Sequence, residues 1–298
     1  MIKTGVNFSG LIGPELIRLL INHPDIDLRW VSGASMPAEG ISAVFDQLQG
    51  EVGKVPVKPD FSSIDLYIGN DFPELESYLA SKDSAKAVIL GPLLKLTGYE
   101  EGILGVCEYN RKALVRGGRL AIQPDMYTYL AAIALMPLAK NLMLNSTVYG
   151  TLLLPGNESL RGIRVPAATL SPLTFKKLRT EILQKMQTSF EAPIEVNAIE
   201  IPNINFACAI FTLDIKMNLS DIRKMYEEFY GDHRHIVFPT HPVSEVMVRG
   251  TNKTVIGLGN DGFGRLIVTV GIDSRFKEAG NVVHMLNLLF GLDELTGF

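Results

Sequence analysis

The chain has 298 residues, of which 47% are hydrophobic and 20% are charged, and this composition excludes an intrinsically disordered protein. Its formal net charge of −4 argues against a nucleic acid or an anionic membrane as the main partner. Two cysteines, Cys107 and Cys208, are too few and too far apart for a disulfide scaffold or a metal knuckle.

The length and the N-terminus indicate a two-domain cytoplasmic protein. Single hydrophobic cores stop growing at about 250–300 residues, so two domains are expected. Met1 leads directly into a strand, without the apolar segment of a signal peptide. The most apolar run, Tyr129 to Leu138, is too short to span a bilayer, and we expect no membrane partner.

The chain opens with a strand, a small-residue turn and a helix. These elements are predicted at Ile2–Val6, Ser9–Gly13 and Pro14–His23. Unpaired backbone N–H groups at such a helix start favour an anion. Asn7 stands where a G-x-x-G-x-x-G pattern has its first glycine. Nucleotide binding and a plain turn between strand and helix therefore remain equal alternatives on this pattern alone.

Short apolar strands continue to alternate with helical segments in the first half. Further strands are predicted at Ile26–Val31, Ile64–Ile68, Ala87–Leu90 and Arg119–Ile122, and a helix at Pro73–Ala80. This alternation predicts a parallel, doubly wound sheet covered on both faces. Ligands bind such sheets beyond the carboxyl ends of the strands. The expected rim comprises Asn7–Gly13, Ser32–Ser35, Gly69–Asp71, Gly91–Pro92 and Gln123–Tyr127.

Ser32 ends the second strand, where NAD sites carry an acidic residue that holds the ribose hydroxyls. A serine, with Arg29 nearby, tolerates a 2′-phosphate better than a carboxylate does. A polar loop without a ligand is an equal alternative.

The second half changes character after Met126. Tyr127 to Leu142 is predicted as a buried helix. Strands that look antiparallel are predicted at Thr147–Leu154, Ile194–Glu200, Ala209–Lys216, Ser244–Val248 and Arg265–Ile272. Helices are predicted at Leu173–Met186, at Asp221–Tyr230 with Ser220 as its cap, and at Ala279–Phe290. This pattern predicts an α+β domain whose sheet is mainly antiparallel and leaves a face for self-association, so a homo-oligomer is expected.

Segments at both ends resemble N-acetyl-γ-glutamyl-phosphate reductases. Gly10–Pro24, GLIGPELIRLLINHP, is similar to the G-Y-T-G turn and E-L-x-R-L-L-x-x-H-P helix of that family. Met285–Phe298 is similar to its closing N-x-M-F-G-L-x-E-x-T-G-L. Shorter similarities lie at Glu108–Arg111, Gly250–Asn252 and Gly264–Leu266.

The resemblance implies an α/β fold with a Rossmann-type domain, residues 1–125 and 276–298, and an α+β domain, residues 126–275. It also implies NADP(H) and the reduction of an acyl phosphate, a small-molecule substrate, to a semialdehyde. That reaction uses a cysteine thioester, a histidine and arginines. The expected cofactor-binding residues are Ser9, Gly10, Gly13, Ser32, Gly91 and Asn252.

The departures from the family fall on its chemical positions. Its P-G-C-Y-P-T segment corresponds to Pro124–Thr128, with Met126 at the position of the nucleophile. A thioether cannot form an acyl-enzyme. The family's other catalytic and anion-binding segments correspond to Leu90–Lys95, Leu178–Thr180 and Ile201–Phe206, which lack its histidines and most of its charges. We therefore predict that the thioester mechanism is lost.

Several residues offer substitutes, each with a simpler structural alternative. Asp125 is a candidate general base or helix cap, and Tyr127 either lines the cleft or packs. Cys208 is a candidate nucleophile or a small buried strand residue. His233, His235 and His241, in the connection after the Asp221–Tyr230 helix, superficially offer metal ligands. They lack a carboxylate at ligand spacing, and no metal is expected.

Three functions follow, in this order. The first is an NADP(H)-linked oxidoreductase that reduces a carbonyl-type metabolite, less anionic than the family's substrate, without a thioester. The second is a non-catalytic paralogue that acts as a binding or regulatory partner. The third is the family's own activity, supported by Cys208. Asn7 and Phe8 replace small residues beside the cofactor pyrophosphate, so they bear directly on the first hypothesis.

Overall fold

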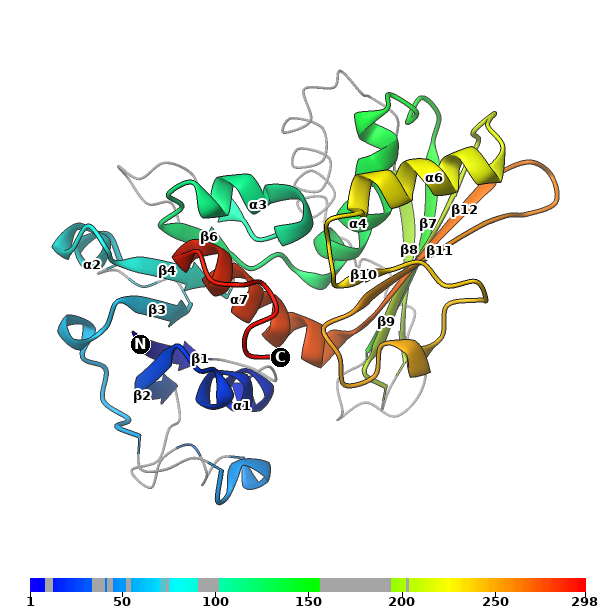
Figure 1. Ribbon diagram of the computed structural model, residues 1–298. Coiled ribbons are helices and arrows are strands. Elements are labelled where there is room, and N and C mark those ends of the chain that lie inside the picture. The colour runs from blue at the N-terminus through cyan, green and yellow to red at the C-terminus, as the bar shows by residue number, and fades with distance from the viewer. Residues whose placement is uncertain are drawn as a thin grey trace. The chain divides into compact units, whose positions relative to one another are not determined.

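The computed structural model describes residues 1–8, 13–33, 41, 45–51, 55–70, 72, 75–90, 102–155, 194–201 and 204–298 (Figure 1). The chain forms two compact units. Unit 1 comprises Met1–Asp125 and Glu278–Phe298, and unit 2 comprises Met126–Lys277. The boundary near the C-terminus lies inside one long helix, α7 (Ser274–Phe290).

Unit 1 contains a parallel sheet with the strand order β2-β1-β3-β4-β6-β5. Its strands are β1 (Ile2–Phe8), β2 (Ile26–Gly33), β3 (Leu66–Gly69), β4 (Lys86–Ile89), β5 (Ile103–Leu104) and β6 (Leu120–Ile122). Its helices are α1 (Gly13–Asn22), α2 (Leu75–Ser81), α3 (Cys107–Val115) and the larger part of α7. The predicted parallel, doubly wound sheet is confirmed.

Burial explains this layered arrangement. The β3 strand is buried throughout, and α1 buries Leu16, Ile17 and Leu20. An aromatic group forms a second core layer, with Trp30, Phe61 and Tyr67 in mutual ring contact. Strands that are apolar along their whole length need cover on both faces, which is the reason a parallel sheet carries helices on each side.

Unit 2 contains a mixed sheet with the order β10-β11-β12-β9-β7-β8. Its strands are β7 (Val148–Pro155), β8 (Ile194–Ile201), β9 (Phe206–Leu213), β10 (Ile236–Val237), β11 (Thr254–Asn260) and β12 (Leu266–Asp273). The long central pairings are antiparallel, as predicted, whereas β8 lies parallel to β7 and β10 parallel to β11. The helices α4 (Met126–Lys140) and α6 (Leu219–Tyr230) pack on this sheet (Figure 1).

Some local predictions were wrong. Residues 244–248 form a short 3₁₀ turn, Glu245–Met247, and the neighbouring strand is β11. Two glycines, Gly257 and Gly259, interrupt the apolar pattern of β11 and hid it. The cap of α6 is Asn218 rather than Ser220, because Asn218 Oδ1 accepts a hydrogen bond from Asp221 N at 2.9 Å. The helix predicted at residues 173–186 lies outside the described residues.

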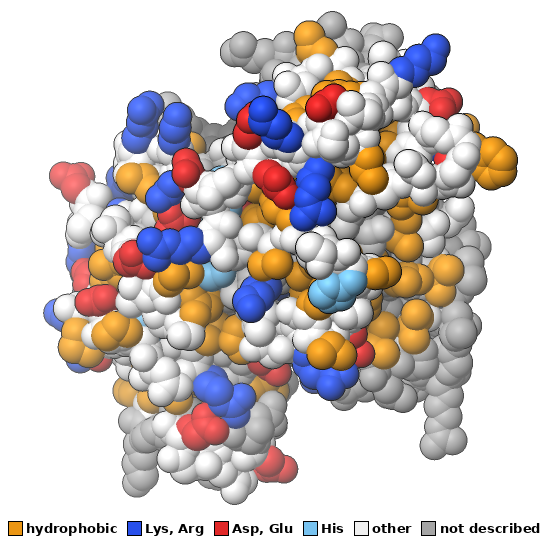
Figure 2. Space-filling view, turned by 45° about the vertical axis from the view of Figure 1, so that its right-hand side comes forward, with side chains coloured by type: hydrophobic (Ala, Val, Ile, Leu, Met, Phe, Trp, Pro, Cys, Tyr) orange, Lys and Arg blue, Asp and Glu red, His pale blue; other side chains and the backbone are white. Residues whose placement is uncertain are grey.

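The surface carries interspersed charges of both signs. Figure 2 shows Lys and Arg side chains beside Asp and Glu side chains across the visible face. Arg18 and Glu51 form an ion pair at 2.8 Å, and Arg223 and Glu227 form another at 2.8 Å. In the part of the chain that the structure describes, no helix is long and apolar enough to cross a membrane.

Candidate functional site

The carboxyl ends of the unit 1 strands meet at a reversal of the strand order. From β1 the chain proceeds through α1 to β2 on one side, and β3 then lies on the other side of β1. Asn7 pairs with Ser32 of β2 and with Gly69 of β3. Such a topological switch point is where doubly wound sheets bind ligands. The structure therefore brings Asn7 and Ser32 to the expected rim.

The residues around this switch point fit a dinucleotide in part. A Cβ at Gly69 would overlap the carbonyl oxygen of Asn7, so only glycine permits this close packing. Gly13 is buried at the start of α1, and its helix dipole favours an anion. Glu15, however, adds a carboxylate to the first turn, and its Oε2 is buried without a hydrogen-bond partner. Because of Glu15, the phosphate position is less favourable than the strand order alone suggests.

The other predicted cofactor residues are only partly described. Ser9, Gly10 and Gly91 lie outside the described residues. Arg29 lies 3.3 Å from Asp27 in an ion pair on β2, so its charge is partly neutralised. Phe8 continues β1, but the structure does not describe its side chain.

The residue predicted to stand at the family's nucleophile position, Met126, lies at the first residue of α4. Met126 begins the helix, and the exposed Asp125 directly precedes it as the last residue of unit 1 in this part of the chain. Tyr127 belongs to the first turn of α4, and its side chain lies outside the described part of the structure. The proposed roles of Asp125 and Tyr127 stay predictions.

Unit 2 contains a buried polar cluster that involves three elements. The hydroxyl of Tyr129 on α4 lies 2.9 Å from Thr254 Oγ1 on β11. The Nζ of Lys277, on the first turns of α7, lies 4.9 Å from the centre of the Tyr129 ring. The same Nζ donates to the carbonyl oxygen of Asn252 at 3.3 Å. Lys277 is only 2% exposed, which is rare for a lysine. Burying its charge destabilises the folded protein unless hydrogen bonds or opposite charges offset the cost.

The Asn252 side chain is the least satisfied group of this cluster. Asn252 is 4% exposed, and both its Nδ2 and its Oδ1 are buried without a hydrogen-bond partner. The turn that holds it is well fixed, since Gly250 has a φ of 67° and Gly250 N donates to Asp273 Oδ2 at 2.8 Å. An orphaned buried amide on a fixed turn is a group that a bound ligand would satisfy. The sequence indicated Asn252 but gave no indication of Lys277.

Neither cysteine resembles a nucleophile. Cys208 is 4% exposed in the middle of β9, and burial raises the pKa of its thiol to about 12. Cys107 is fully buried at the start of α3. A thiol with so high a pKa is almost entirely protonated at neutral pH, and only the thiolate attacks an acyl group. Within the described residues, no group of three or more His, Cys, Asp or Glu could hold a metal ion.

Replacing Cys208 by Ala is therefore expected to leave any catalytic activity unchanged and to lower stability by about 1 kcal/mol through lost packing. In the folded protein, 5,5′-dithiobis(2-nitrobenzoate) should label neither thiol at pH 8, whereas it should label two in urea. Rapid labelling of one thiol in the folded wild type, absent in Cys208→Ala, would contradict the buried position and revive Cys208 as a nucleophile.

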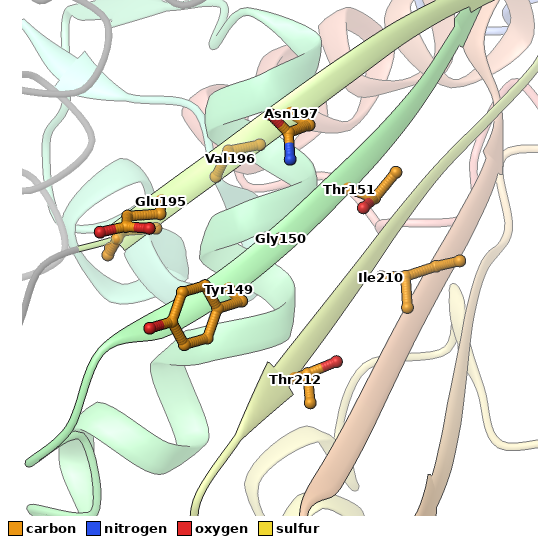
Figure 3. Close-up of a pocket in the computed structure, with 9 residues that line it drawn as sticks. Tyr149, Gly150, Thr151, Glu195, Val196, Asn197, Ile210 and Thr212 are labelled. Atoms are coloured by element: carbon orange, nitrogen blue, oxygen red, sulfur yellow. The ribbon is translucent and has the colours of Figure 1, made fainter. Parts of the chain in front are cut away.

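A cavity of about 520 Å³ lies on one face of the unit 2 sheet (Figure 3). Tyr149 and Thr151 on β7 stand opposite Thr212 and Ile210 on β9 in the strand register. Glu195 on β8 pairs with Tyr149 on the other side. The lining mixes hydroxyl, carboxylate and aliphatic groups, and Tyr149 is 54% exposed. The sequence-predicted site residues do not line this cavity.

Comparisons with known proteins give consistent results. No protein-family profile matches the chain. The N-acetyl-γ-glutamyl-phosphate reductase of Parabacteroides distasonis is 31% identical, with 100% of this chain and 98% of the relative covered. The reductase of that name from Methanosarcina barkeri is 28% identical with the same coverage. An aspartate semialdehyde dehydrogenase II from Vibrio cholerae has a similar fold, with a TM-score of 0.65, 15% identity and coverage of 97% and 98% of the two chains.

Proposed function

Because the chain belongs to the N-acetyl-γ-glutamyl-phosphate reductase family, we propose that it is an NADP(H)-linked oxidoreductase that reduces a carbonyl group of a small metabolite without a cysteine thioester. The family supports the reaction type, and the six-stranded parallel sheet with its switch point supports a dinucleotide. A bound reduced nicotinamide would supply the hydride. The protein would bind and orient the carbonyl compound and provide a proton.

The observation that carries this proposal is the buried pair of Lys277 and Asn252. The Asn252 amide, whose two polar atoms are buried without a hydrogen-bond partner, destabilises the folded protein unless a ligand uses it, and Lys277 lies beside it, 2% exposed. The Nζ–H groups of Lys277 and the Nδ2–H of Asn252 are donors that suit an oxygen-rich small molecule. On this proposal both residues hold a polar group of the substrate, and Tyr129 fixes the position of Lys277.

The residue at the nucleophile position restricts the substrate. Met126 cannot form a thioester, and the pKa of Cys208, about 12, leaves that residue protonated. An acyl phosphate would need such an intermediate, whereas an aldehyde, ketone or imine accepts a hydride directly. We therefore expect a free carbonyl compound that is less anionic than an N-acyl glutamyl phosphate.

Met126 also favours a second candidate, a non-catalytic paralogue that serves as a binding or regulatory partner. A member of the family that has lost its nucleophile can retain the fold and an interaction surface. The face of the unit 2 sheet that bears Tyr149 is suited to self-association, and a homo-oligomer is part of both proposals. The two candidates differ in whether a nicotinamide cofactor binds.

Thermal unfolding in the presence of cofactor distinguishes the two candidates. NADPH at 100 times its Kd should stabilise the folded protein by about 2.7 kcal/mol, and NADH should do so less at equal concentration. Ser32→Asp is the matched control, because a carboxylate at the end of β2 repels a 2′-phosphate and accepts the ribose hydroxyls. This variant should reverse the preference toward NADH. If neither cofactor changes the unfolding temperature at millimolar concentration, the oxidoreductase proposal fails and the paralogue is favoured.

A further inference from the structure

The first unit 1 residue of α7, Glu278, lies at the carboxyl ends of β5 and β6. Gln123 follows β6, and its Nε2 donates to the backbone oxygen of Glu278 at 3.4 Å. One turn further, Asn281 Nδ2 donates to Gly105 O, just after β5, at 2.8 Å and to Gln123 Oε1 at 2.9 Å. These contacts fix the unit 1 part of α7 at the end of the sheet where parallel sheets bind ligands.

A second carboxyl group acts on Glu278. Asp125 is exposed and comes two residues after Gln123. Burial first, and the negative charge of Asp125 second, raise the pKa of Glu278 to about 7. Arg275 and Lys277 precede Glu278 on α7. With a pKa of about 7, the carboxyl group of Glu278 is half protonated near neutral pH, which is the condition that suits a general acid.

A buried hydrogen-bond acceptor on Asn281, at the same end of the sheet as Glu278, indicates a binding position. Asn281 is 1% exposed, and its Oδ1 is buried without a hydrogen-bond partner although its Nδ2 makes two hydrogen bonds. A ligand with an N–H or O–H donor would satisfy Oδ1. This acceptor points to a ligand independently of the two carboxyl groups.

We propose that Glu278 is the proton donor for carbonyl reduction, with Asp125 as a positioning residue whose negative charge favours the protonated form of Glu278. This inference rests on the proposed function. As the carbonyl carbon receives the hydride, the electron pair of the C=O π bond moves to the oxygen. Glu278 transfers its carboxyl proton to that oxygen, which gives the alcohol, and the resulting carboxylate takes a proton from solvent.

The test compares wild type with Glu278→Gln, Asp125→Asn and Glu228→Gln. Glu228 is the control, because it is exposed and its ion pair among the described residues is with Lys224 on the same helix. With NADPH and a panel of short unphosphorylated aldehydes such as propanal and glutaraldehyde, Glu278→Gln should reduce kcat by about 100-fold. Asp125→Asn should lower the pKa of Glu278 and so shift the alkaline limb of the pH profile, where the proton donor is lost, to lower pH. Glu228→Gln should change nothing.

A readout independent of turnover keeps this inference separate from the proposed function. A carboxyl group with a pKa raised from 4.5 to about 7 stabilises the folded state below pH 4.5, and that stability is lost as pH rises to about 7. The urea midpoint of wild type minus that of Glu278→Gln should therefore fall across this window. A flat difference overturns the role of Glu278 even if NADPH binds and aldehydes are reduced. A falling difference without NADPH binding refutes the proposed function instead.

Discussion

Replacing Asn287 by Leu is expected to lower the free energy of unfolding by about 3 kcal/mol, the largest effect of any single substitution that we consider. Asn287 is fully buried on α7 and connects two distant segments of unit 1. Its Oδ1 lies 2.9 Å from His23 Nε2, at the end of α1, and its Nδ2 donates to Thr296 O at 2.9 Å.

The direction of these hydrogen bonds explains the size of the effect. His23 Nδ1 accepts from Asp25 N at 3.1 Å, so Nε2 carries the proton and donates to Asn287 Oδ1. A leucine has a similar volume but neither donor nor acceptor. His23 Nε2 and Thr296 O would lose their partners, and each buried orphan costs about 1–3 kcal/mol.

Urea denaturation at pH 7 measures the effect, and two further variants test its origin. Gly297 has a φ of 86°, and a Cβ there would overlap the His23 ring, so Gly297→Ala should also destabilise the protein. Leu295 is 37% exposed in the same tail, and Leu295→Ala should change stability by less than about 0.5 kcal/mol. Equal effects of all three variants would mean that the tail is not held through Asn287.

This hydrogen-bonded group gives a structural reason for the resemblance at the two ends of the sequence. The H-P end of the first helix and the closing T-G-F contain His23, Thr296 and Gly297, which lie together around Asn287. The family segments that matched best thus belong to the scaffold. They predict the fold well, because they fix it, and they say little about the reaction.

Local sequence patterns predicted the central elements for physical reasons. An amphipathic repeat such as that of α1, or an apolar run such as β3, reflects burial directly. The short β5 and the weakly amphipathic α3 gave no such signal, and β11 was hidden by its glycines. The parallel pairing of β7 and β8 is a tertiary arrangement that a strand pattern alone does not reveal.

The candidate site was less predictable because its chemistry comes from tertiary contacts. Lys277 in a helix sequence looks like an ordinary surface lysine, and only the fold shows that it is 2% exposed beside Tyr129. Glu278 looks equally ordinary, since its proximity to Asp125 and Gln123 joins positions more than 150 residues apart. Asn252 was indicated only by a resemblance of three residues. Burial and long-range pairing are the properties that a sequence without its fold does not display.

The same asparagine-to-leucine change at Asn252 is expected to act in the opposite direction, raising the free energy of unfolding by about 1–2 kcal/mol. Asn252 is 4% exposed, and neither side-chain atom has a hydrogen-bond partner, so Leu would replace an unsatisfied amide with an apolar group of similar size. The hydrogen bond from Lys277 Nζ goes to the backbone oxygen of Asn252 and is retained.

When removing a polar group stabilises a protein, that group serves binding rather than folding. Functional sites contain unsatisfied polar groups whose destabilising free energy is offset by the rest of the fold. Asn252→Leu should therefore lower kcat/KM for aldehyde reduction by at least about tenfold, equivalent to about 1.4 kcal/mol, while its urea midpoint rises. Asn287→Leu is the matched control, with a falling midpoint. If Asn252→Leu instead destabilises the protein by more than about 1 kcal/mol, its amide has a structural partner. The Lys277–Asn252 pair would then lose its support as a substrate-binding site.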